Sequence, residues 1–173
     1  MVKQIANRIP TRKDSFLVFS TCVLFVHSWH TLMFLYAIDH LVLKANTFQI
    51  IGVYSYIIIF ALLESITLFF IILLLCVLFP QNWFRNRFVY LGSSLAMLLT
   101  GFAILSSSYP FQYKSWIVII YVLLIMIYCI YIIKRPIEKV QSSSLSERAS
   151  VIAIMYLFID LVALFIIFLR QVI

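Results

Sequence analysis

Long runs of apolar residues dominate the sequence, and short polar segments separate them. A run of about 20 apolar residues is long enough to cross a bilayer as a helix. A membrane β-barrel would instead show shorter strands in which polar and apolar residues alternate. The pattern therefore predicts an all-α fold, a polytopic transmembrane bundle of five helices. These helices span about residues 15–40, 50–79, 88–106, 115–134 and 149–170.

The polar segments between the apolar runs are too short to form a separate folded unit. The longest of them extends only from Lys134 to Arg148. We therefore expect residues 1–173 to form a single five-helix transmembrane domain with no soluble domain. The first apolar run is too long for a signal peptide and has no evident cleavage site, so we expect an uncleaved first helix.

Composition and charge agree with this prediction. Hydrophobic residues make up 65% of the chain and charged residues only 11%, which is far from the average of soluble domains. The formal net charge is +7, but the basic residues gather at the ends of the apolar runs, where they indicate topology. The lipid bilayer is therefore the expected partner, and we expect no nucleic-acid partner.

The distribution of basic residues also predicts an orientation. With five helices, ten of the 13 Lys and Arg residues fall on the side of the membrane that holds the N-terminus. The side richer in Lys and Arg is normally cytoplasmic. We therefore expect a cytoplasmic N-terminus and an external C-terminus, in a multi-pass protein of the cell membrane, with the bacterial plasma membrane as the default.

Three ionisable residues fall near the middle of predicted helices. Glu64 lies near the centre of the apolar run from Gly52 to Phe79, His27 lies at the centre of the first run, and Asp160 lies at the centre of the last. An acid at the centre of a bilayer costs about 2.5–3.5 kcal/mol on insertion scales, so such residues are rare and have a reason to be there.

Pairing between helices would lower this cost. We expect Glu64 and Asp160 to face the bundle interior at similar depth, with His27 or His30 close to one of them. Tyr156 lies one turn before Asp160 on the same helix face, so its hydroxyl can join them. The predicted buried polar cluster is therefore His27, His30, Glu64, Tyr156 and Asp160.

The third predicted helix is rich in small residues, which allow close approach of another backbone. Gly92, Ala96 and Gly101 mark this helix-packing or partner face. Packing within the chain is the simpler interpretation. The alternative is that the helix of another subunit docks there.

No motif for catalysis is evident. The sequence lacks the glycine-rich loop of ATPases, the serine motif of hydrolases, the zincin motif and the Glu-x-x-His pairs of di-iron proteins. We therefore predict no enzyme activity, no catalytic residue, no bound metal and no cofactor. The three cysteines lie in apolar runs and have no Cys-x-x-Cys spacing, so we interpret them as buried apolar residues.

These observations favour a non-catalytic integral membrane subunit or scaffold of a larger membrane protein complex. Its buried polar cluster would tie together the first, second and fifth helices, and its partners would be other membrane protein subunits. The alternative is a small proton- or ion-coupled transporter or channel that acts as an oligomer. A second alternative is an intramembrane protein that binds haem or a quinone, because histidines are present on the first helix.

Overall fold

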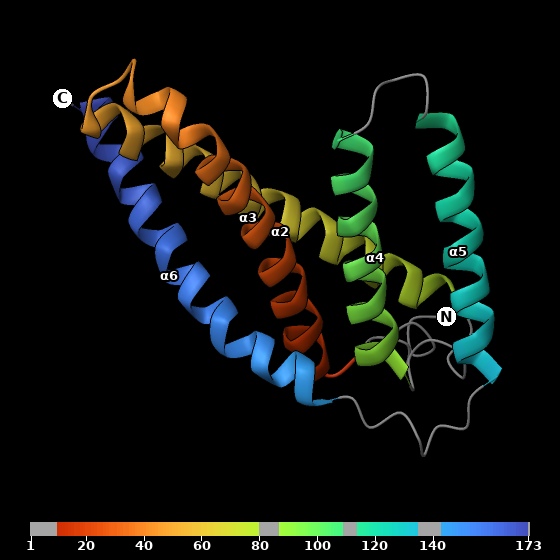
Figure 1. Ribbon diagram of the computed structural model, residues 1–173. Helices are drawn as coiled ribbons and strands as arrows, with labels where there is room; N and C mark the ends of the chain where they lie inside the picture. Colours follow the sequence, from red (N-terminus) through yellow and green to blue (C-terminus); the bar gives the residue numbers. More distant parts are fainter. Residues whose placement is uncertain (1–9, 80–86, 109–113, 135–142, 173) are drawn as a thin grey trace.

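The computed structural model describes residues 10–79, 87–108, 114–134 and 143–172. Within these residues the chain is all-helical (Figure 1). Its helices are α2 (Arg12–Val42), α3 (Thr47–Leu78), α4 (Phe88–Ser108), α5 (Lys114–Lys134) and α6 (Ser143–Val172). The predicted all-α fold class is therefore confirmed, and each of the five predicted helices is present.

Four of the helices are long and apolar enough to cross a membrane. The spans are Arg12–Val42, Thr47–Leu78, Phe88–Ser106 and Glu147–Gln171. The apolar stretch described within α5 is shorter, Val118–Tyr128. Length and composition thus support a membrane-embedded chain and account for four of the five predicted crossings.

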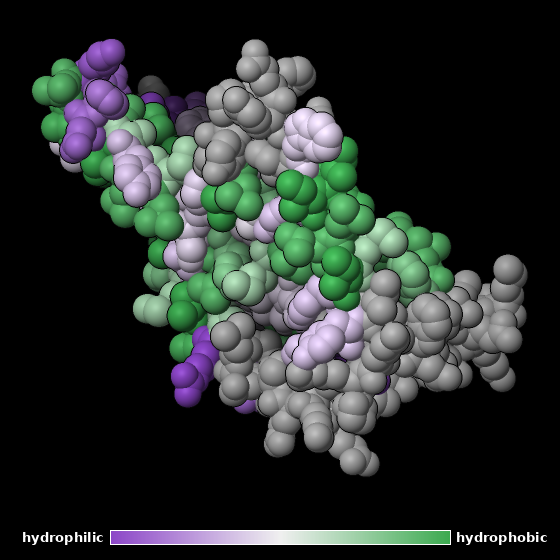
Figure 2. Space-filling model, turned by 45° about the vertical axis from the view of Figure 1, so that its right-hand side comes forward, coloured by the Kyte–Doolittle hydropathy of each residue, from purple (hydrophilic) through white to green (hydrophobic). Residues whose placement is uncertain are grey.

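The surface of the bundle matches this environment. In Figure 2 hydrophobic residues cover much of the described surface, and the most hydrophilic ones gather at its ends. Large side chains such as Phe70, Phe158 and Phe165 are more than 60% exposed. Exposed apolar surface on this scale marks a protein that contacts lipid or other membrane proteins.

Polar side chains fix the starts of α2 and α3. The backbone N–H of Asp14 donates to the side-chain oxygen of Thr11, so Thr11 caps α2. Asn46 and Gln49 form a capping box, in which each side chain accepts from the other residue's backbone N–H at 3.1 Å or less. Both helices therefore begin about three residues earlier than the apolar runs predict, because the capping residues are polar.

α2 is the central helix of the bundle. It packs against α3, α4 and α6, whereas α5 packs mainly on α4. Figure 1 shows α2, α3 and α6 running obliquely to α4 and α5, which stand side by side. A polar residue at the middle of α2 can therefore reach three neighbouring helices.

The length of α3 requires a tilt or an extension beyond the hydrocarbon layer. Its 32 residues span about 48 Å at the helical rise of 1.5 Å per residue. The hydrocarbon core of a bilayer is only about 30 Å thick. In Figure 1 α3 runs obliquely to α4 and α5, so these helices cannot all stand parallel to one bilayer normal.

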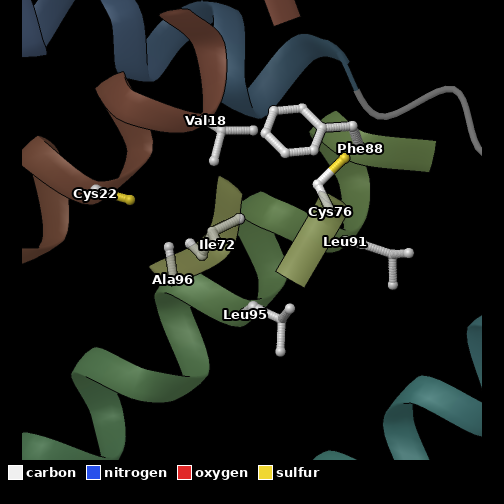
Figure 3. Close-up of a cluster of buried hydrophobic side chains, with 8 residues drawn as sticks. All are labelled: Val18, Cys22, Ile72, Cys76, Phe88, Leu91, Leu95 and Ala96. Carbon is white, nitrogen blue, oxygen red and sulfur yellow. The ribbon is translucent and has the colours of Figure 1, made fainter. Parts of the chain in front are cut away.

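A compact apolar cluster joins α2, α3 and α4 (Figure 3). Its members are Val18, Cys22, Ile72, Cys76, Phe88, Leu91, Leu95 and Ala96. Cys22 and Cys76 are fully buried in it, as the interpretation of the cysteines as apolar residues predicts. The side chain of Cys129 lies outside the described residues.

The small residues of α4 pack within the chain. A Cβ atom on Gly92 would lie 2.9 Å from both Cγ atoms of Val18 and 3.3 Å from Cγ2 of Ile72. Ala96 is fully buried. A Cβ atom on Gly101 would meet the hydroxyl of Tyr121 at 2.8 Å. Gly92 and Gly101 lie on opposite sides of α4, so the three residues do not form one face as expected. Gly92 packs against α2 and α3 and Gly101 against α5, which favours the simpler of the two interpretations, packing within the chain.

This packing predicts opposite effects for two matched substitutions. Gly92→Ala should destabilise the fold by about 1–3 kcal/mol, because its Cβ overpacks against the branched Val18 side chain. Gly101→Ala should be neutral or stabilising, since the end of the Tyr121 side chain can move aside and alanine favours helix by about 1 kcal/mol. Thermal unfolding in detergent measures both variants, and equal stability of the two would contradict the packing described here.

Candidate functional site

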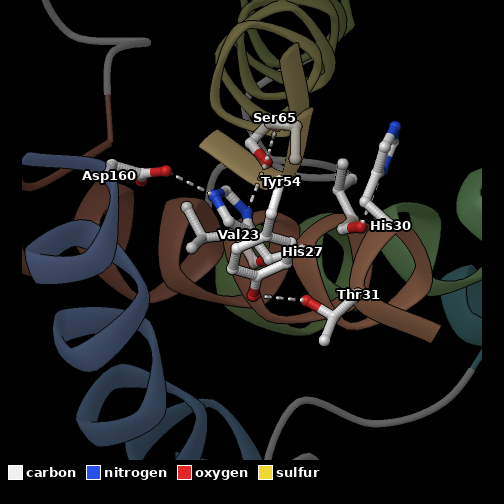
Figure 4. A network of polar contacts seen from close by, with 9 residues as sticks. Val23, His27, His30, Thr31, Tyr54, Ser65 and Asp160 are labelled. Carbon is white, nitrogen blue, oxygen red and sulfur yellow. Dashed lines mark hydrogen bonds and ion pairs between the residues drawn. The ribbon is translucent and has the colours of Figure 1, made fainter. Parts of the chain in front are cut away.

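His27 of α2 and Asp160 of α6 meet in the interior of the bundle. Nε2 of His27 lies 3.0 Å from Oδ1 of Asp160 (Figure 4). His27 is 0% exposed and Asp160 is 2% exposed. His27 is also the central residue of α2 (Arg12–Val42). Two of the residues predicted from their depth in the sequence therefore contact each other directly.

The hydrogen bonds of His27 define its protonation pattern. Nδ1 lies 3.0 Å from the carbonyl oxygen of Val23, and a carbonyl oxygen can only accept, so Nδ1 carries a hydrogen. The contact between Nε2 and Oδ1 of Asp160 then requires one proton, either on the imidazole or on the carboxyl group.

Both positions of this proton leave the His27–Asp160 pair without net charge. An imidazolium beside a carboxylate has a net charge of zero, and so has a neutral imidazole beside a carboxylic acid. An isolated charge in the bilayer is costly, whereas a paired and hydrogen-bonded acid is much less so. The pairing therefore explains how Asp160 is tolerated at this depth.

Side chains from three helices surround the pair. Ser65 of α3 is fully buried; its Oγ lies 3.5 Å from Nδ1 of His27 and donates to the carbonyl of Ala61. The ring of Tyr156 lies 5.1 Å from that of His27, centroid to centroid, and its hydroxyl lies 3.3 Å from Oγ of Ser28. The pair is thus the point at which α2, α3 and α6 meet.

Among the described residues, His27 is the only side chain that forms a hydrogen bond with the Asp160 carboxyl group. Its second oxygen, Oδ2, is buried and has no hydrogen-bond partner among the described residues. Removal of the imidazole would therefore leave a buried carboxyl group without a polar contact, which costs about 1–3 kcal/mol or more.

Glu64 does not face the interior, contrary to the sequence-based expectation. Its side chain is 59% exposed, and it forms a long ion pair with His30, whose Nε2 lies 3.6 Å from Oε2. This distance is too long for a direct hydrogen bond. His30 donates from Nδ1 to the carbonyl of Val26 at 3.0 Å and points away from Asp160 in Figure 4. The five predicted residues therefore form two separate groups, one with His27, Tyr156 and Asp160 and one with His30 and Glu64.

Ser65, and not Glu64, is the residue of α3 that faces the bundle interior at this point. Consecutive residues of a helix point about 100° apart, so Glu64 and Ser65 cannot share a face. A signal for the inward face was present in the sequence, because small residues recur within a sector of about 120° on α3. These buried small residues are Ser55, Ala61, Ser65 and Cys76.

The chemistry available at this site is hydrogen bonding and the sharing of a proton. Both ring nitrogens of His27 already have partners, so His27 is not available as an axial haem ligand. No group of three His, Cys, Asp or Glu side chains that could hold a metal occurs among residues 10–79, 87–108, 114–134 and 143–172.

Comparison with known proteins gives no relative for this chain: no protein-family model, curated protein or solved structure matches it.

The coupling between His27 and Asp160 can be measured with a double-mutant cycle. His27→Leu and Asp160→Leu should each destabilise the bundle, and the double variant should lose less than the sum. Hydrogen bonds between membrane helices give a coupling of about 0.6–1.7 kcal/mol, which unfolding in mixed detergent micelles can measure. A control cycle that combines Asp160→Leu with Thr67→Val, an exposed residue of α3, should be additive. Additivity of the first cycle would contradict the pairing.

Proposed function

We propose that the chain is a non-catalytic integral membrane subunit or scaffold of a larger membrane protein complex. The observation that supports this proposal most is the His27–Asp160 pair. It is buried, its two residues bond to each other, and it carries no net charge. A polar pair of this kind fixes how α2 and α6 pack. Its role is to hold a particular arrangement of helices, which is what a scaffold must provide.

Other polar side chains within the helices form hydrogen bonds with the backbone of their own helix. Hydroxyl groups donate to the carbonyl of the residue four positions earlier, at distances from 2.7 to 3.0 Å. These residues are Ser20, Thr21, Ser55, Ser65, Thr67 and Ser94. A hydroxyl that donates to a carbonyl of its own helix has its proton satisfied locally, which lowers the cost of its burial. This supports a structural role over transport.

A small proton- or ion-coupled transporter acting as an oligomer is the second candidate. The observation that favours it is Glu64, an acid exposed on the middle of α3. Intramembrane acids mark proton or ion pathways in many membrane proteins. In an oligomer, a neighbouring chain would cover Glu64.

We place the protein in the cell membrane, by default a bacterial plasma membrane, with five crossings, the N-terminus in the cytoplasm and the C-terminus outside. The excess of Lys and Arg on the N-terminal side supports this orientation. An even number of crossings would place both termini on one side, so the location of the C-terminus tests the helix count and the orientation together.

The orientation predicts the behaviour of C-terminal fusions. An alkaline phosphatase fused to the C-terminus should be active, because this enzyme folds only outside the cytoplasm. A fluorescent protein that matures only in the cytoplasm should be dark at the same position. Enzyme activity and fluorescence in whole cells measure both, and the reverse pattern would show that one crossing has been miscounted.

The scaffold proposal predicts that the chain brings a different protein with it. Purification in mild detergent should recover a partner subunit in constant proportion. Asp160→Asn should retain that partner, because the amide can still hydrogen-bond to His27, whereas Asp160→Leu should lose it. Glu147→Gln, at an exposed acid near the start of α6, is the matched control and should have no effect.

The outcome of this purification separates the scaffold from the transporter and from the remaining alternative, an intramembrane haem protein. A homo-oligomer without a partner would favour the transporter, and a coloured preparation would favour a haem protein. Loss of function in Asp160→Asn with the fold and the assembly intact would also contradict a purely structural role, because the amide preserves shape but not proton exchange.

A further inference from the structure

A cleft opens beside Glu64, on the side of α2 away from the His27–Asp160 pair. It has a volume of about 300 Å³, and α2, α3 and α4 all contribute to its wall. The lining residues are Val26, Trp29, His30, Glu64, Leu68, Leu99, Thr100 and Ala103. A mostly apolar cleft of this volume with a few convergent polar groups is typical of a small-molecule site.

Two polar features of this cleft can still form a hydrogen bond with a ligand. Thr100 is only 7% exposed, and its buried hydroxyl has no hydrogen-bond partner among the described residues. In the part of the lining that α2 and α3 contribute, Nε2 of His30 and Oε2 of Glu64 lie 3.6 Å apart, too far for a direct hydrogen bond. A buried hydroxyl without a bond costs free energy, so a ligand that supplies one would be stabilised.

The position of the cleft restricts where such a ligand comes from. Thr100 and Glu64 lie near the middle of α4 (Phe88–Ser108) and α3 (Thr47–Leu78). A ligand at this depth arrives through the hydrocarbon layer and therefore needs an apolar tail. A whole helix is about 10–12 Å across and does not fit a cleft of about 300 Å³, whereas a single substituted ring does.

The polar groups restrict the head group of the ligand. Nδ1 of His30 donates to the carbonyl of Val26. Nε2 of His30 and the Glu64 carboxyl group can therefore donate or accept a hydrogen bond, according to which of them carries a proton. The Thr100 hydroxyl can also do both. A neutral ring with oxygen atoms on opposite sides can bond to both groups, whether these oxygens are carbonyls or hydroxyls.

We propose that this cleft binds the head group of a membrane quinone or quinol. The ring lies against the apolar residues and Trp29. One ring oxygen bonds to the hydroxyl of Thr100, which is buried in the free chain and turns toward the cleft on binding, and the other ring oxygen bonds to the His30–Glu64 pair. The proposal concerns binding alone and is independent of the scaffold role, because a subunit can hold such a molecule with or without a partner.

Trp29 provides a direct readout, because a quinone quenches the fluorescence of a nearby indole. Titration of decylubiquinone into the full chain in lipid nanodiscs should quench fluorescence in a saturable way, and decylubiquinol should compete. Trp29→Phe should remove the saturable part and leave only the linear quenching of the other tryptophans. Quenching that is linear in the unaltered chain would overturn the proposal.

Substitutions of Thr100 and Glu64 test the proposed hydrogen bonds to the ligand. Thr100→Val and Glu64→Gln should each weaken binding by about fivefold, the loss expected for one hydrogen bond, and Thr100→Ser should restore it. Thr67→Val removes an exposed hydroxyl of α3 outside the cleft and should leave the affinity unchanged. Equal affinity in all these variants, or failure of Thr100→Ser to restore binding, would overturn the proposal. Recovery of a partner subunit is measured separately, so a negative result here leaves the scaffold proposal standing.

Discussion

The hydrogen bond between His27 and Asp160 is the interaction on which the helix arrangement depends. A bilayer offers no water to an unpaired polar group, so each must find its partner within the protein. His27 is the central residue of the most contacted helix, α2, and Asp160 has no other partner for its carboxyl group among the described residues. The contact between them therefore fixes the register of α6 against α2, and Ser65 brings α3 to the same point.

The other contacts of α2 are made by apolar and small residues. Val18 lies against Gly92 of α4, and Thr21 reaches Ser93 of the same helix at 3.3 Å. Without a strong hydrophobic driving force between helices in lipid, close packing and such polar contacts provide the attraction. α2 is thus held at one end by close packing with α4 and at its middle by the pair with α6.

The positions of the central residues along each helix could be read from the sequence, but their direction around the helix could not. The centre of an apolar run is found by counting, and two residues found in this way, His27 and Asp160, contact each other. The direction depends on which helices pack together. Glu64 was assigned to the interior because it is an acid, although the small residues of α3 mark a different face, on which Ser65 lies.

Helix ends show a second limit of counting apolar residues. α6 begins at Ser143, six residues before the predicted start at 149, because a helix continues into water when its polar residues tolerate helical geometry. The apolar run measures the part of a helix that lies in lipid, whereas hydrogen bonding and capping determine where the helix itself begins. The starts of α2 and α3 at polar caps have the same cause.

The most direct test of this account is the distance between the His27 ring and the Asp160 carboxyl group in a lipid bilayer. Solid-state NMR with ¹⁵N-labelled histidine and ¹³C-labelled aspartate measures it through dipolar dephasing. The account predicts strong dephasing between His27 Nε2 and the Asp160 carboxyl carbon, as required by the 3.0 Å contact between Nε2 and Oδ1. It also predicts that this dephasing disappears in Asp160→Leu. Absence of dephasing in the unaltered, folded chain would contradict the claim that this pair joins α2 to α6.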